Sequence, residues 1–302
     1  MTAGNGSGAA ARRSEQRRRI LIASGSILAV IVIIVVFIVV KATSSPSASA
    51  AKASTNSPAG SALAAVVTKV TTVPASTLNA VADGGGSVAT TPITISGKTL
   101  TSGGKPEMLF MGAEYCPYCA AERWAMIVAL SRFGTFSGLA TMHSASANGT
   151  GQAEPYPDTP TWTFVHATYS SPYLTFTPVE METNIPDPST GGYTTLQTPT
   201  KAQLALIDKY DAAPYISSAD AGAIPFVDFG NKYMIVGASY SPQVLSGLSW
   251  STIATDLHHP NSAVATGVDG TANYITAAIC AMTGNQPASA CTPTVKALEI
   301  QL

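Results

Sequence analysis

The residue types best suited to chemistry are two cysteines, Cys116 and Cys119, in a C-x-x-C spacing. A short apolar run at residues 108–111 predicts a strand just before them, and a helical pattern follows at once, with Pro117 in its first turn. A cysteine at the start of a helix lies near unpaired backbone N–H groups and the positive end of the helix dipole, and both favour the reactive thiolate. We therefore expect Cys116 to be the nucleophile and Cys119, one turn further on, to resolve a mixed disulfide.

Two other interpretations of this spacing remain open, namely half of a zinc site and an ordinary disulfide. A zinc site usually needs a second pair of ligands at similar spacing. The remaining cysteines, Cys280 and Cys291, do not form such a pair, and none of the four histidines completes a standard ligand set. The sequence therefore predicts redox chemistry, with neither a metal ion nor another cofactor.

The helix that starts at the cysteines is expected to continue to residue 133. Glu122 and Arg123 are among its good helix formers. Gly134 is expected to end the helix in a left-handed conformation. An apolar stripe is expected to be buried and includes Trp124, Ile127 and Val128.

The N-terminal part of the chain predicts a membrane anchor. Residues 1–19 form a polar, arginine-rich tail, and residues 20–40 carry no charge and consist mainly of Ile and Val. Such a stretch spans roughly 30 Å as a helix, the thickness of a bilayer core. The arginines place the N-terminus in the cytoplasm and the rest of the chain outside it, in the cell membrane as a single-pass protein. A cleaved signal peptide is the alternative, although its apolar region is usually only about 7–15 residues long.

A flexible linker and one domain are expected to follow the anchor. Residues 41–61 are rich in Ser, Ala, Thr and Pro and have too few large apolar residues to fold. Residues 62–302 then form the domain, with an insertion at about 144–199 and a C-terminal helical extension. Local patterns predict two hairpins, one within residues 92–100 and one joining 161–167 to 173–179. The net charge of −1 and the 11% of charged residues argue against a nucleic-acid partner.

A second informative stretch is Ile224-Pro225, directly before an apolar run at residues 226–229. Proline is awkward in a central strand, but it suits a cis bond that leads into the edge of an active site. A trans proline at the start of a strand remains open. Gly230-Asn231 predicts a tight hairpin, with residues 232–236 as the returning strand.

The order of these parts resembles the thioredoxin-like superfamily over roughly residues 90–255. The shared parts are a strand, the C-x-x-C, a helix, an insertion, Ile224-Pro225, a hairpin and a closing helix. The stretch GAEYCPYCAAERWA behind an anchor also resembles a family of membrane-anchored, extracytoplasmic thioredoxin-like proteins that has no established substrate. The resemblance implies an α/β fold with a central mixed sheet flanked by helices.

The resemblance also implies roles for individual residues. Pro225 is expected to be cis and to pack against the active-site cysteines, and the substrate-binding edge is expected to comprise Pro117, Tyr118, Ile224 and Pro225. One departure concerns the buried aspartate that thioredoxins carry six residues before the first cysteine. That position is Phe110 here, and the distance from Glu114 to Cys119 does not follow from the sequence.

Two functional hypotheses follow. The first is a membrane-anchored thiol–disulfide oxidoreductase that donates disulfides to, or isomerises disulfides in, exported proteins. By analogy alone, a quinone-linked membrane enzyme is the candidate redox partner that reoxidises it. The second is a membrane-tethered binding module whose C-x-x-C is a static disulfide.

Cys280 and Cys291 are expected to form a structural disulfide. Residues 271–283 predict a helix that carries Cys280, and Cys291 follows a turn. In an exported domain with four cysteines, the pair outside the C-x-x-C is expected to be bonded and to attach the C-terminal segment to this helix. The alternative is a relay disulfide that exchanges electrons with Cys116 and Cys119.

Overall fold

The computed structural model describes residues 57–147, 150 and 154–302. The basic tail, the predicted transmembrane helix and most of the linker lie outside these residues. Among the described residues, no single helix is long and apolar enough to cross a membrane. Helices α2 (Gly60–Thr71) and α3 (Ala75–Val81), bent by 59° where they meet, reach that length and composition only as a pair. Both helices also place side chains, including Val70 and Leu78, in the main apolar core.

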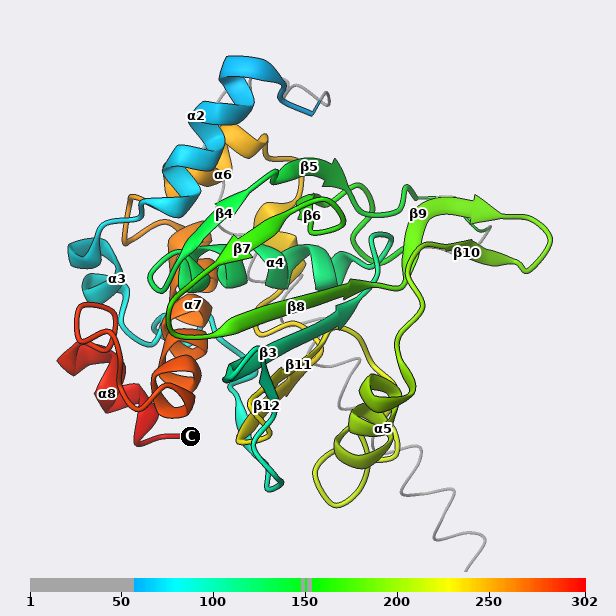
Figure 1. Ribbon diagram of the computed structural model, residues 1–302. Helices are drawn as coiled ribbons and strands as arrows, with labels where there is room; N and C mark the ends of the chain where they lie inside the picture. The colour runs from blue at the N-terminus through cyan, green and yellow to red at the C-terminus, as the bar shows by residue number, and fades with distance from the viewer. Residues whose placement is uncertain (1–56, 148–149, 151–153) are drawn as a thin grey trace, which may run out of the picture. The chain divides into compact units, whose positions relative to one another are not determined.

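A mixed sheet forms the centre of the fold (Figure 1). Five of its strands lie in the order β1 (Ile93–Thr94), β12 (Tyr233–Val236), β11 (Phe226–Phe229), β3 (Lys105–Gly112) and β8 (Thr175–Glu180). Strand β8 runs parallel to β3, and β11 runs antiparallel to both β3 and β12. A short strand, β2 (Thr101–Ser102), forms a hairpin with the start of β3.

Helices cover both faces of this sheet. Alternate side chains of a strand point to opposite faces, so Met108 and Phe110 enter one apolar cluster and Leu109 and Met111 enter another. Helices α4 (Pro117–Leu130) and α7 (Ala263–Met282) pack together in the first cluster, and α5 (Lys201–Tyr210) contributes to the second. The protein is therefore an α/β protein with a central mixed sheet flanked by helices, consistent with the fold that the resemblance implies.

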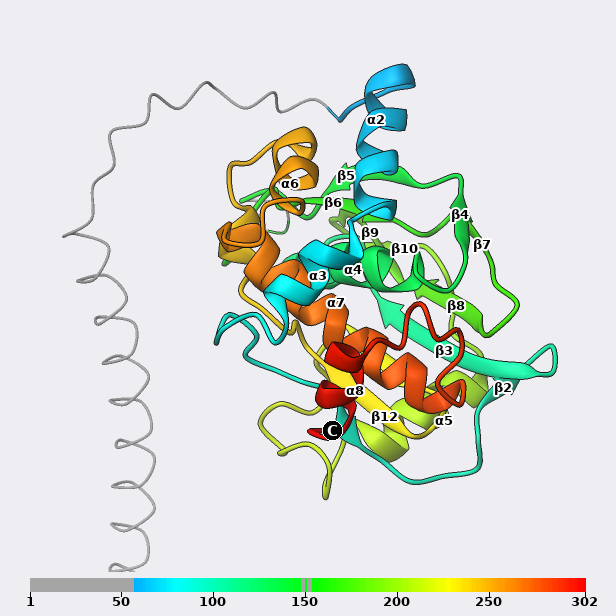
Figure 2. The same ribbon diagram turned by 90° about the vertical axis from the view of Figure 1, so that its left-hand side faces the viewer.

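The other elements surround this framework. Figure 2 shows α3, α7 and α8 in front of the sheet. Three further strand pairs, β4 with β7, β5 with β6 and β9 with β10, lie outside the central sheet. The bounds of these remaining elements are β4 (Thr135–Ser137), β5 (Ala140–His143), β6 (Pro160–Thr163), β7 (Thr168–Ser170), β9 (Glu182–Asp187), β10 (Gly192–Thr195), η1 (Pro242–Leu245), α6 (Trp250–Asp256) and α8 (Pro293–Glu299).

The two hairpins expected from local patterns are not formed. Strand β1 pairs with β12, far along the chain, and β2, which begins just after residue 100, pairs with the next strand, β3, so residues 92–95 and 98–100 do not form a hairpin with each other. Likewise β6 pairs with β5, and β8 joins the central sheet beside β3. The interval 144–199, expected to be an insertion, thus supplies one strand of the central sheet. Strand β8 pairs with β3 over a long sequence distance, and its last two residues, Val179 and Glu180, are buried there.

Helix α4 differs from the expected helix in two ways. Nearly all of its side chains are buried, and Tyr118 is the exposed exception, because the sheet and α7 enclose the helix from different sides. Glu122 and Arg123 are therefore fully buried, against the expectation of a single apolar stripe. The helix ends at Leu130, and Gly134 is not left-handed. A Cβ at Gly134 would instead collide with the Ser170 carbonyl oxygen of β7, so close packing requires glycine there.

The C-terminal helices also differ in their bounds. Helix α7 starts at Ala263, before the expected start at residue 271, because Ser262 caps it by accepting a hydrogen bond from the Ala265 N–H. Ser241 caps only a short 3-10 turn, η1, which ends at Leu245. By contrast, the Gly230-Asn231 hairpin is present, with φ of 67° and 57° at these two residues.

Candidate redox site

The C-x-x-C lies where β3 passes into α4. Cys116 is the N-cap residue of α4, and its Sγ accepts a hydrogen bond from the Cys119 backbone N–H at 3.2 Å. Pro117 occupies the first turn of the helix. Two backbone hydrogen bonds hold the preceding turn, from the Glu114 N–H to the Glu182 carbonyl and from the Ala145 N–H to the Tyr115 carbonyl. The thiol of Cys116 is thus fixed at the positive end of the helix dipole.

The two thiols have opposite acidities. Burial acts to raise the pKa of the Cys116 thiol, but hydrogen bonds from the Cys119 thiol and backbone N–H and the charge of Arg123 lower it more, so its pKa is lowered overall. Burial and the neighbouring Cys116 raise the pKa of the Cys119 thiol well above its usual range. Cys116 is 4% exposed and Cys119 is fully buried. Cys116 is therefore the more acidic and the more exposed of the two thiols.

Ile224 and Pro225 lie across from Cys116. The Ile224–Pro225 peptide bond is cis, and the Cys116 Sγ lies 3.7 Å from the Ile224 carbonyl oxygen. The next residue, Phe226, begins β11 and pairs with Met111 near the end of β3. Because β11 and β3 are neighbours in the sheet, the proline segment is held beside the turn that carries the cysteine.

A groove runs beside this segment. Its cavity volume is about 570 Å³, and its lining comes from four separate parts of the chain, including Thr90, Tyr118, Tyr215, Ile224 and Val236. The Tyr118 side chain is 39% exposed and packs edge to face against Tyr156, with ring centres 5.9 Å apart. The structure thus brings Tyr118 and Ile224 to one groove next to Cys116.

A buried ion pair lies behind the cysteines. Arg123 donates to Glu180 through Nε at 2.9 Å and through Nη2 at 2.6 Å, and both side chains are fully buried. Arg123 Nη2 also donates to the Ala113 carbonyl oxygen at 2.8 Å. Sequence reasoning placed Arg123 among ordinary helix formers. Its spacing of four residues from Cys119 was the signal that could have indicated a shared helix face.

Among the described residues, Phe110 and not a carboxylate stands where thioredoxins carry a buried aspartate. Phe110 fills that position, and its ring packs against Phe164 and lies 5.6 Å from the Arg123 guanidinium. The Glu114 carboxylate turns to Thr163, whose hydroxyl donates to it at 2.6 Å. Burial raises the pKa of Glu114, and the hydrogen bond from Thr163 opposes that rise. The described surroundings of Cys119 therefore provide a cation rather than an acid.

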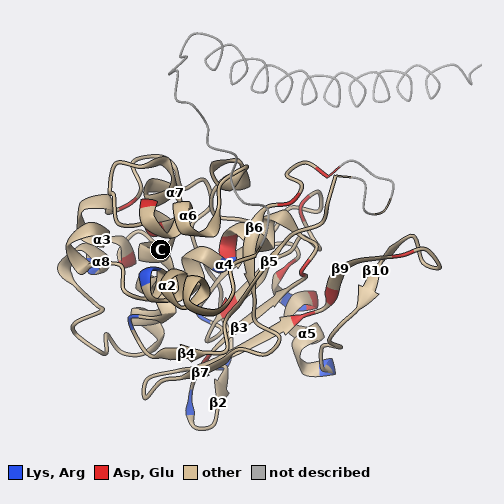
Figure 3. Cartoon of the chain, turned by 90° about the horizontal axis from the view of Figure 1, so that it is seen from above, with Lys and Arg blue, Asp and Glu red and all other residues tan. Residues whose placement is uncertain are grey.

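Further acids of the described fold are buried, among them Glu122, Asp228 and Asp269. Burial raises the pKa of Glu122 to about 7, although Ser239 donates two hydrogen bonds to its carboxylate. Burial likewise raises the pKa of Asp228 to about 7 and of Asp269 to about 8. Figure 3 shows charged residues spread over many elements of the described chain, including an acidic position in α4. No local pattern around these acids indicates that they are buried.

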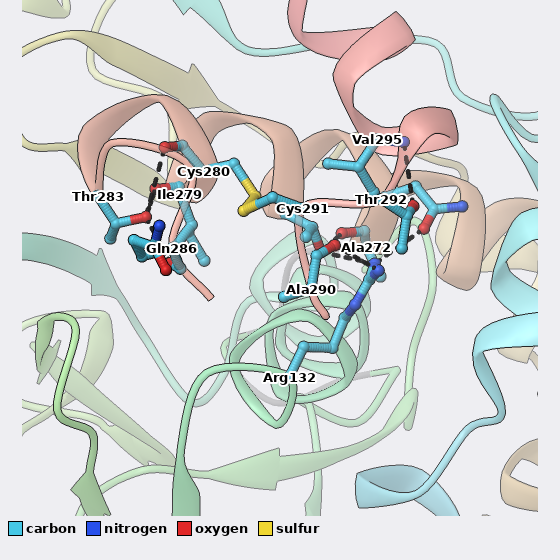
Figure 4. The surroundings of a disulfide bond; sticks show 12 residues. Arg132, Ala272, Ile279, Cys280, Thr283, Gln286, Ala290, Cys291, Thr292 and Val295 are labelled. Carbon is cyan, nitrogen blue, oxygen red and sulfur yellow. Dashed lines mark hydrogen bonds between the residues drawn. A yellow bond between two sulfur atoms is a disulfide. The ribbon is translucent and has the colours of Figure 1, made fainter. Parts of the chain in front are cut away.

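Cys280 and Cys291 form a disulfide at the other end of the fold (Figure 4). Both residues are buried, at 0% and 3% exposure, and their Cα atoms are 5.8 Å apart. Arg132, just past the end of α4, donates to the Ala290 carbonyl oxygen at 2.8 Å, beside Cys291. Cys116 caps the opposite end of the same 14-residue helix. Such a helix is about 20 Å long, so the structure does not bring the two cysteine pairs together.

No group of three or more His, Cys, Asp and Glu side chains in the described residues is placed to hold a metal ion. His143 instead packs edge to face on Trp250, with ring centres 4.5 Å apart, and burial lowers its pKa.

The fold and the site can be set beside known proteins. Searches of curated proteins and of solved structures found no significant match. A family described as Domain of unknown function (DUF929) matches residues 91–281, which include the C-x-x-C, the Ile224–Pro225 segment and the central sheet. This match covers more than half of the chain. The chain therefore belongs to the DUF929 family.

Proposed function

We propose that this protein is a membrane-anchored, extracytoplasmic thiol–disulfide oxidoreductase of the thioredoxin-like kind. The observation that carries the proposal is the Cys116 thiol, which caps α4, accepts a hydrogen bond from the Cys119 N–H and faces the carbonyl of Ile224 before a cis proline. The sheet order β8–β3–β11–β12, with β8 parallel and β11 antiparallel to β3, supports the same fold assignment.

The proposed reaction is an exchange of disulfides in two steps. When the pair is oxidised, a substrate thiolate attacks the Cys116 sulfur, the Cys116–Cys119 bond breaks, and Cys119 leaves as a thiolate that takes up a proton. A second substrate thiolate then attacks the substrate sulfur of the mixed disulfide, which forms the substrate disulfide and releases the Cys116 thiolate. The substrate loses two electrons and the cysteine pair gains them. The reverse sequence, which starts from the Cys116 thiolate, reduces a substrate disulfide.

The groove supports a role in substrate binding for Pro117, Tyr118, Ile224 and Pro225. Tyr118 and Ile224 line it, and Pro117 and Pro225 position these two neighbours. An extended segment of an exported protein that lies in the groove would pass within reach of Cys116. We infer that its thiols or disulfides are the substrate.

The cell-surface location is also part of the proposal. The buried Cys280–Cys291 disulfide supports an oxidising compartment, because structural disulfides are rare in the cytosol. The apolar stretch at residues 20–40 and the arginines before it support an anchor with a cytoplasmic N-terminus. In this setting the cysteine pair donates disulfides, and a membrane redox partner reoxidises it.

Trapping tests the proposed function. A Cys119→Ala variant cannot resolve a mixed disulfide, so it should accumulate covalent adducts with exported proteins through Cys116. A Cys116→Ala variant, which keeps the buried thiol, is the matched control and should trap nothing. Two results would favour a binding module with a static disulfide. One is equal trapping by both variants. The other is no trapping by either variant, together with a Cys116 thiol that does not react with an alkylating reagent at neutral pH.

A further inference from the structure

Arg123 is placed to act on the redox pair. It is the one lysine or arginine with a fully buried side chain among the described residues. It lies four residues after Cys119 in α4, and side chains with this spacing share a helix face. Its Nη2 donates to the carbonyl of Ala113, and the backbone of that same residue acts to lower the pKa of the Cys119 thiol.

The space around the Cys119 sulfur is closed to bulk solvent, since Cys119 is fully buried, and it is tightly packed. A Cβ on Gly112 would lie 3.1 Å from the Cys119 Sγ and would also press on the Phe110 ring. That ring lies in turn under the Arg123 guanidinium, 5.6 Å from ring centre to Cζ. Because water is excluded here, a charge acts more strongly on its neighbours than it would at the surface.

Glu180 balances the arginine only in part. It accepts two hydrogen bonds from Arg123, at 2.9 and 2.6 Å. Arg123 Nη1 is buried and has no hydrogen-bond partner in the described structure. The charge of Arg123 acts to lower the pKa of both thiols. The ion pair therefore keeps one guanidinium nitrogen that has no acceptor in the described structure, while Glu180 accepts from the other two.

We propose that Arg123 is a positioning residue that stabilises the thiolates of Cys116 and Cys119, and that Glu180 moderates this effect. This inference rests on the proposed function and adds the direction of electron flow. Stabilising the thiolates stabilises the reduced pair, and a stabilised reduced pair makes its disulfide a stronger oxidant. In the exchange step above, the Cys119 thiolate that leaves when the disulfide opens is the species that benefits. The arginine thus favours donation of a disulfide to the substrate, which is oxidised as the cysteine pair is reduced.

The test compares variants of the pair in the full chain. Arg123→Met combined with Glu180→Met removes both charges together and avoids leaving one buried charge unpaired. Glu180→Gln keeps the arginine and removes only its acceptor. Arg132→Met is the matched control, because Arg132 lies past the opposite end of α4 and its hydrogen bonds go to Asn273, Thr276 and Ala290. The readout is the pH dependence of thiolate absorbance and of alkylation, with Cys116 and Cys119 followed separately.

The variants should move the thiol pKa in opposite directions. In the double variant the pKa of Cys116 should rise by about one unit, which lowers its thiolate fraction about tenfold at a pH below both values. The equilibrium with glutathione should then shift toward the protein disulfide. Glu180→Gln should lower the pKa, and Arg132→Met should leave it unchanged. An unchanged pKa in a folded double variant, or a shift in the same direction in Glu180→Gln, would overturn the proposal.

If the double variant does not fold, the thiol pKa values of Glu180→Gln and Arg123→Lys test the proposal. Arg123→Lys keeps the charge and should keep the pKa close to that of the wild type, so a rise as large as that expected for charge removal would contradict an electrostatic role. These readouts need no protein substrate. If the wild type exchanged with no protein disulfide, the proposed function would fail while the effect of Arg123 on thiol acidity would still be measured.

Discussion

Replacing Cys280 and Cys291 together by alanine should lower the stability of the domain but leave its redox chemistry intact. The two residues are 11 apart in sequence, so the bond closes a loop of about 12 residues. In the chain-entropy model, releasing a loop of this size from its cross-link costs about 3 kcal/mol. For a domain of about 250 residues, that loss corresponds to a fall in Tm of about 6–12 °C. Alanine is a better replacement than serine, because both positions are buried and a hydroxyl group there would need a hydrogen-bond partner.

Thermal unfolding followed by circular dichroism measures this change, and alkylation of Cys116 at neutral pH measures the site. The alkylation rate should equal that of the wild type, because the disulfide lies near the far end of α4, about 20 Å from the Cys116 cap. A Tm within 2 °C of the wild type would refute the stabilising role. Loss of disulfide exchange with an unchanged Tm would refute the structural assignment and indicate a relay between the two pairs.

Three further predictions concern the packing around α4. Glu122→Gln should remove part of the pH dependence of stability. Burial raises the pKa of Glu122 from 4.5 to about 7, so its carboxyl stays protonated to a higher pH in the folded state than in the unfolded state. The free energy of unfolding therefore falls as pH rises from about 4.5 to 7. Urea titrations at pH 5 and pH 8 should show this fall in the wild type to exceed that in the variant, and an identical fall would contradict the burial of the carboxylate. Gly134→Ala should destabilise the domain by about 1–3 kcal/mol in chemical denaturation, because a Cβ there meets the Ser170 carbonyl. An unchanged free energy of unfolding would show that β7 can move away. Trp124→Ala should cost about 3–5 kcal/mol, since the side chain is fully buried and its Nε1 donates to the Pro160 carbonyl at 2.8 Å, and a cost below 1 kcal/mol would contradict this packing.

Local chemistry made part of the fold predictable. The start of α4 follows from cysteine and proline at a helix N-terminus, and the β11–β12 turn follows from Gly230-Asn231. The capping box of α5 is also visible in the sequence, since Thr200 and Gln203 exchange hydrogen bonds with each other's backbone. In each case the residues that decide the structure are within four positions of one another.

Long-range packing decided the rest. The pairing of β1 with β12 and of β3 with β8 depends on strands that are far apart in the sequence, so neighbouring residues carry no record of it. The same reason explains Arg123 and Glu122. Charged residues in a helix normally face solvent, and only the enclosure of α4 by the sheet and α7 places both in the interior. The candidate cysteines could be found from their spacing, whereas the ion pair behind them could not.

A redox titration of Cys116 and Cys119 against glutathione tests the central claim most directly. It is made on the full chain, with the Cys280–Cys291 disulfide intact, and the two thiols are counted by mass after alkylation. The proposal predicts a reduction potential in the range of thiol–disulfide exchange proteins, between about −270 and −120 mV, and nearer the less negative end if the pair donates disulfides. A potential below about −300 mV would mark a stable structural bond and would contradict the assignment of an oxidoreductase.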